Sequence, residues 1–176
     1  ESDLMQAVQL LSKLSLSELS PELAKSERAE ICSDLTSELA DAFSNASAVL
    51  SENEHFAQAA AAAEQSIRLR SLRLQSLSGD ATEITADQLS RLAITHNNFA
   101  SLLWRSGNTV GAVDAYRDAV KLLERSIQSA PGQTAPRDRL AVTLNNLGMA
   151  YASAGNTTEA ERALTRAASL AQPALD

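Results

Sequence analysis

The chain has 176 residues, of which 44% are hydrophobic but only 3% aromatic, and its formal net charge is −7 at pH 7. This length fits about one domain, and a core of alanine and leucine with few rings suits closely packed helices. The acidic balance argues against nucleic-acid binding, the lone Cys32 permits no internal disulfide, and no run reaches the roughly 20 apolar residues of a membrane helix.

Although the chain as a whole is acidic, one short stretch of it is basic. Arg68, Arg70 and Arg73 follow one another closely, but they do not share one helical face, and leucines lie between them. We therefore interpret them as an ion-paired, solvated helix surface rather than a phosphate site.

Capping residues and hydrophobic periodicity predict seven helices. Ser20-Pro21 marks the start of the second, Gly79-Asp80 the break after the third, and Thr85 with Gln88 a capping box before the fourth. We expect the first helix to be a cap or the remnant of a preceding repeat, with three hairpins after it. In chain order the predicted helices span 3–15, 21–52, 55–77, 86–106, 109–129, 136–154 and 157–171.

The second half of the chain contains an internal duplication. A shift of 48 places aligns 91–122 with 139–170, with 13 of 32 positions identical and no gap. Each copy reads as two helices joined by a Gly-Asn pair, in which glycine ends the first helix in a left-handed conformation and asparagine caps the second. Alanines then recur at spacings of three and four, which places small residues where a neighbouring helix can approach. These residues are Gly107, Asn108, Ala112, Ala115 and Ala119, with Gly155, Asn156, Ala160, Ala163 and Ala167.

The last copy resembles the tetratricopeptide repeat, whose pattern is W-x2-L-G-x2-Y followed by A-x3-F and a closing proline. Its matching residues are Leu144 in place of the tryptophan, Leu147, Gly148, Tyr151, Ala160, Leu164, Ala167 and Pro173. The middle copy matches with His96, Phe99, Ala100, Leu103, Ala112, Tyr116 and Ala119. The period of 48 departs from the usual 34 of the family. Elongated units with a paired asparagine are similar to those of kinesin light chains and of arrays attached to bacterial serine/threonine kinases and signalling proteins.

A more divergent copy precedes these two. It fits at 33–69 when Asn45 is set against Asn98, and Asn53 then stands near the turn in place of glycine. The predicted fold is thus an all-α, right-handed solenoid of about three helical hairpins plus one extra N-terminal helix. We expect a single repeat domain over 1–176, a fragment of a longer protein, with an extra helix at 1–20 and repeats at 21–79, 80–131 and 132–176.

The resemblance implies that the first helix of each hairpin lines a concave groove that binds a peptide or helix of another protein. An asparagine there can pair with the backbone of a peptide, or it can bond the neighbouring helix and fix the stacking. Trp104 is either an interface hot spot or a cover over the end of its hairpin. The candidate groove residues are Asn45, Asn97, Asn98, Ser101, Trp104, Arg105, Asn145, Asn146 and Met149.

We do not expect an enzyme, a cofactor or a metal site. His55 and His96 are far apart in sequence and are interpreted as structural, and the chain has no glycine-rich phosphate loop or nucleophile elbow. The predicted function is a cytoplasmic protein-interaction scaffold, without nucleic acid or membrane insertion. The alternatives are self-association as a homodimer through the last helix, a regulatory segment of a signalling enzyme such as a kinase, and a small-molecule sensor with a pocket between hairpins.

Overall fold

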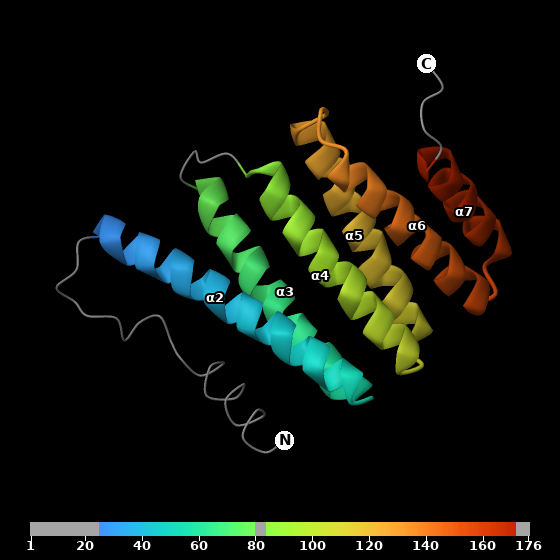
Figure 1. Cartoon of the computed structure of the whole chain (residues 1–176), viewed down its shortest axis with the longest axis horizontal. Helices are drawn as coiled ribbons and strands as arrows, with labels where there is room; N and C mark the ends of the chain where they lie inside the picture. The colour runs from blue at the N-terminus through green and yellow to red at the C-terminus, as the bar shows by residue number, and fades with distance from the viewer. Residues whose placement is uncertain (1–24, 80–83, 172–176) are drawn as a thin grey trace. The chain divides into compact units, whose positions relative to one another are not determined.

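The computed structural model describes the backbone of residues 25–79 and 84–171 and, of these, the side chains of 34–75 and 84–171. All of the regular structure within these residues is helical, which confirms the all-α prediction (Figure 1). The predicted helix at 3–15 and the predicted start at Ser20-Pro21 lie outside the described residues. The helices are α2 (Lys25–Glu52), α3 (Phe56–Gly79), α4 (Ala86–Arg105), α5 (Thr109–Ser129), α6 (Ala135–Ser153) and α7 (Thr157–Ala171).

The chain divides into two compact units, one containing α2 and α3 and the other α4 to α7. In the second unit the ends of the helices agree with the predicted ranges to within one residue. The predicted repeat boundaries at 21–79, 80–131 and 132–176 remain predictions.

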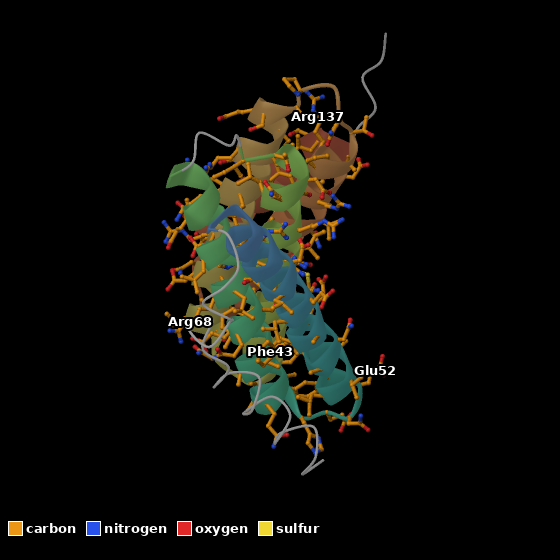
Figure 2. All side chains as sticks on the ribbon, turned by 90° about the vertical axis from the view of Figure 1, so that its left-hand side faces the viewer. Phe43, Glu52, Arg68 and Arg137 are labelled. Atoms are coloured by element: carbon orange, nitrogen blue, oxygen red, sulfur yellow. The ribbon has the colours of Figure 1, made fainter. Side chains whose placement is uncertain are left out.

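The first unit is a hairpin in which small side chains let α2 and α3 approach closely. Ala40 and Ala59 are fully buried, and Phe43 is the large aromatic residue of the contact. Two buried hydroxyls cross the hairpin: Ser66 Oγ donates to the carbonyl of Ala40, and Ser47 Oγ donates to that of Ala59, both over 2.8 Å. Figure 2 labels Phe43 in this unit, with Glu52 at the end of α2 and Arg68 on α3, both of them exposed.

The turn between α2 and α3 corrects one prediction. Asn53 does not take the left-handed conformation; its side-chain Nδ2 instead donates to the carbonyl of Val49 over 2.7 Å. Glu54 is the left-handed residue, at φ 63°. The next amide, of His55, donates to the carbonyl of Leu50 over 2.9 Å, so Glu54 occupies the position that glycine usually fills in this helix-ending motif.

The second unit consists of two hairpins, α4–α5 and α6–α7, with α6 packed on both α5 and α4. Its core contains Tyr116 and Leu123 from α5, each 1% exposed, together with Leu144 and Leu147 from α6. In Figure 1, α6 runs alongside α5, and α7 follows α6. Gly148 permits the close approach of α6 to α7, because a Cβ at this position would lie 2.7 Å from Leu164 Cγ.

The predicted left-handed glycines of the second unit are confirmed, and so are the predicted caps of α4 and α5. Gly107 and Gly155 have φ values of 87° and 79°. Asn108 Oδ1 accepts a hydrogen bond from the amide of Gly111 over 3.0 Å and so caps α5. The capping box of α4 is formed in both directions. These local signals fix where each helix begins and ends. They thereby help to determine which residues of α4 and α6, the first helices of the two hairpins, are exposed.

Candidate functional site

Three of the predicted groove asparagines meet across the first helices of the second unit. Asn146 Nδ2 on α6 donates to Asn97 Oδ1 on α4 over 3.3 Å, and Asn97 Nδ2 donates to Asn98 Oδ1 over 3.4 Å. We call Asn146, Asn97 and Asn98 the amide chain. It connects the two hairpins at the surface, since Asn98 is exposed and the other two are half-buried.

Each end of the amide chain retains hydrogen-bonding capacity. Within the described residues, Asn98 uses its oxygen and Asn146 uses its nitrogen. Asn98 Nδ2 is therefore left as a donor and Asn146 Oδ1 as an acceptor. An amide with one free donor and another with one free acceptor complement the C=O and N–H of a peptide backbone. The other interpretation of the groove asparagines was a bond to the neighbouring helix. Such a bond is also present, between Asn146 and Asn97.

Asn145 and Met149 extend this surface along α6. Both are exposed, and Asn145 Nδ2 lies 3.8 Å from Met149 Sδ, within the range of a weak hydrogen bond to sulfur. Met149 itself is 44% exposed. An exposed, flexible thioether offers an apolar contact that can adapt to the shape of a partner.

The remaining predicted residues of α4 differ in their exposure. Ser101 is half-buried and hydrogen-bonds to the hydroxyl of Tyr116. Burial raises the pKa of Tyr116 above its ordinary value, while this hydrogen bond acts in the opposite direction. Trp104 is half-buried and packs against the core, and Arg105 is exposed in the last turn of α4. The role of Trp104 as an interface hot spot remains a prediction.

Asn45 lies on the exposed surface of α2, in the first unit. The amide chain is formed by residues of the second unit alone. Asn45 therefore remains a predicted contact of the first hairpin.

A hollow of about 220 Å³ lies beside the amide chain, and the sequence did not reveal it. Ile94 and Val142 occupy equivalent positions of the two copies and remain 37% and 59% exposed. Neither is among the predicted groove residues. Two outward-facing aliphatic residues at one repeat position were the available signal. The hollow is lined by Ile94, Asn97, Leu123, Asp138, Arg139, Val142 and Thr143.

The two histidines do not form a shared site within the described residues. His96 lies between the helices of its hairpin, and its Nδ1 is buried without a hydrogen-bond partner. Burial lowers the pKa of His96, and the carboxylate of Asp118 opposes this shift. His55 instead places its Nδ1 2.6 Å from the carbonyl of Asn53. In the part of the chain that the structure describes, no three His, Cys, Asp or Glu residues form a cluster that could hold a metal ion. No helix there is long and apolar enough to cross a bilayer.

Comparison with solved structures found several proteins of low sequence identity. A structure described as "DHF58 filament" aligns with a TM-score of 0.48 and 16% identity, over 96% of this chain and 91% of that chain. YrrB, described as "a TPR protein with an unusual peptide-binding site", gives 0.29 and 15%, over 96% and 82%. BtubC (BKLC) from P. vanneervenii gives 0.23 and 15%, over 96% and 88%.

Sequence comparison identifies the last hairpin. No curated protein matches the chain. The family model described as tetratricopeptide repeat matches residues 140–174, which comprise most of α6 and all of α7. The close contact of Gly148 with Leu164 lies inside this match, at two positions of the repeat pattern. The matched part of the chain, the α6–α7 hairpin, is therefore similar to a tetratricopeptide repeat.

Proposed function

We propose that this chain is a protein-interaction scaffold that binds a segment of a partner protein across the outward face of α4 and α6. Stacked helical hairpins of this kind present extended surfaces on which other proteins bind. The observation that carries the proposal is the amide chain, because it spans two repeats and leaves one donor and one acceptor at its ends.

The composition of this face supports binding to a backbone together with apolar side chains. Asn98 and Asn145 are exposed amides, and Ile94, Val142 and Met149 are exposed apolar residues on the same two helices. Exposed apolar residues that form a contiguous patch are typical of interaction sites. The amides would orient the partner, and the apolar contacts would supply most of the affinity.

We further propose that the chain acts by binding alone, without a cofactor. Its buried polar groups support this view, since they serve the packing of the hairpins. Ser126 Oγ donates to the carbonyl of Ala86 over 2.7 Å, and Arg139 Nη1 donates to Ser90 Oγ over 2.7 Å. These contacts hold neighbouring helices together.

The test is a quantitative pull-down that compares the wild-type chain with an Asn98→Ala/Asn146→Ala double variant. Gln128→Ala is the matched control, because Gln128 is an exposed amide on α5, away from the amide chain. Circular dichroism should show unchanged helicity in all three proteins. We expect proteins that bind the wild type and the control to be lost with the double variant. Equal recovery with all three would contradict the proposal.

A further inference from the structure

We propose that the segment bound on the α4–α6 face is an extended, polyproline-II-like stretch with aliphatic residues three apart and an acidic flank. The first aliphatic side chain would enter the hollow between Ile94 and Val142, and the second would lie against Met149. This inference rests on the proposed function and specifies the chemistry of its partner.

The hollow fits one aliphatic side chain. Its walls are Ile94 and Val142, and Leu123, only 1% exposed, lies at its base. Its volume of about 220 Å³ is below the roughly 300–1,000 Å³ of sites that enclose a whole small molecule. A single leucine-sized group that enters from a larger ligand is therefore a better fit than a free small molecule.

The spacing of the apolar contacts along α6 selects the conformation of the partner. Val142, Asn146 and Met149 follow at intervals of four and three, so they share one face of the helix. Val142 and Met149 are thus roughly 10.5 Å apart along the helix axis. A polyproline II segment repeats its side-chain direction every three residues, over about 9.3 Å. In a β-strand, side chains that point in the same direction are about 6.8 Å or 13.6 Å apart. Both distances fit the spacing of Val142 and Met149 less well.

The amide chain separates this conformation from a helical partner. A helix with apolar residues seven apart also spans roughly 10.5 Å, but its backbone N–H and C=O groups are already bonded internally. A polyproline II segment has no internal hydrogen bonds. Its backbone can therefore donate to Asn146 Oδ1, which lies between the two apolar contacts, and can accept from Asn98 Nδ2.

Charge complementarity favours an acidic segment. Helices α4 and α6 carry four arginines and two aspartates, a net charge of +2, although the whole chain carries −7. Arg139 and Asp138 lie at the hollow itself, and Arg105 lies at the other end of α4. Carboxylates beside the aliphatic residues would therefore meet the positively charged helices of this chain. The basic residues are Arg91, Arg105, Arg137 and Arg139, and the acidic ones are Asp87 and Asp138.

The experiment uses capped synthetic peptides and the intrinsic fluorescence of Trp104, the only tryptophan of the chain, with calorimetry as a second readout. The first peptide carries two leucines three apart in a proline-rich, glutamate-flanked host, with one residue between the leucines that retains its N–H. The second has the leucines two apart in the same host. The third has them seven apart in an alanine-rich helical host.

We expect the first peptide to bind at least about tenfold more tightly than the second or third, because only it can bury both leucines and bond the amides. Val142→Ser should weaken its binding about tenfold, and Val142→Phe should block the hollow. Val110→Ser is the matched control, because Val110 is a 73% exposed valine on α5. Val142 is itself 59% exposed, so its replacement should leave the fold intact.

Three outcomes would overturn the inference: tighter binding of the helical peptide, equal effects of Val142→Ser and Val110→Ser, or no binding of any peptide. If any of these occurred while Asn98→Ala/Asn146→Ala still lost the cellular partner, the proposed function would stand and only its partner chemistry would be wrong. Loss of both results would reject the α4–α6 face as the binding surface.

Discussion

Replacing Gly107 by alanine should destabilise the second unit through backbone conformation alone. Gly107 has φ 87°, and a Cβ built on it would meet nothing within 4 Å. No steric clash therefore contributes. A left-handed conformation costs an L-residue about 1–2 kcal/mol, and alanine offsets about 0.4–1 kcal/mol of this by restricting the unfolded chain. The free energy of unfolding should fall by up to about 1.6 kcal/mol.

Gly132 supplies the matched control in the same unit. It too has open space around its Cβ position, but its φ lies outside the left-handed region. Gly132→Ala should therefore raise the free energy of unfolding by about 0.4–1 kcal/mol. The two substitutions change the same atoms and should differ by about 1–2 kcal/mol, which is the left-handed penalty itself.

The assay is urea unfolding at 25 °C, followed by circular dichroism for all helices and by Trp104 fluorescence for the second unit. Trp104 lies three residues before Gly107, so its signal reports on the hairpin that is perturbed. If Gly107→Ala and Gly132→Ala shift the midpoint equally, or if Gly107→Ala stabilises the unit, conformational strain is not what selects glycine at this turn.

Three further substitutions test other parts of the packing. Glu54→Gly should stabilise the α2–α3 hairpin by up to about 1 kcal/mol in urea unfolding, since it removes a left-handed penalty at φ 63°. Stability should fall as the pH drops below about 6.5, because burial lowers the pKa of His96 and the unfolded chain then binds the proton more readily; His96→Leu should flatten stability measured between about pH 7.5 and 5.5. Gly148→Ala should cost about 1–3 kcal/mol by thermal unfolding, because its Cβ meets Leu164 Cγ at 2.7 Å, and Leu164→Ala should restore part of that loss.

The helices could be predicted because their ends depend on local chemistry. Gly107 and Gly155 adopt the left-handed conformations expected of them, and Thr85 and Gln88 cap α4 as their spacing indicates. The prediction for the α2–α3 turn was wrong because it followed the preference of asparagine for the left-handed conformation and not the register of the repeat. A shift of 53 places Glu54, not Asn53, against Gly107. In this turn, the position in the motif decided the conformation.

The candidate site was predicted less completely, because it depends on how helices distant in the sequence pack. The groove asparagines of the two copies predicted a contact with a peptide or a bond to the neighbouring helix, without the pair of residues that would form that bond. The bond that forms joins Asn146 to Asn97, because α4 and α6 meet at that register. The hollow is formed by Leu123 of α5 together with Ile94 of α4 and Val142 of α6. An alignment of the two copies does not show that these three residues meet.

The two copies also differ on the outer face of their second helices, and this bears on self-association. On α5 the four positions that pack toward α6 are large, apolar and buried, whereas their equivalents on α7 are smaller or charged and exposed. The pairs are Val113 and Glu161, Tyr116 and Leu164, Val120 and Ala168, and Leu123 and Ala171. Leu164 is 39% exposed, with its remaining surface against Gly148, so α7 has little apolar area to offer a second copy. We expect sedimentation equilibrium to give the same mass for the wild type and Leu164→Glu at every concentration tested. A wild-type mass that rises with concentration, and does not rise in the variant, would show that this small surface is sufficient for a dimer.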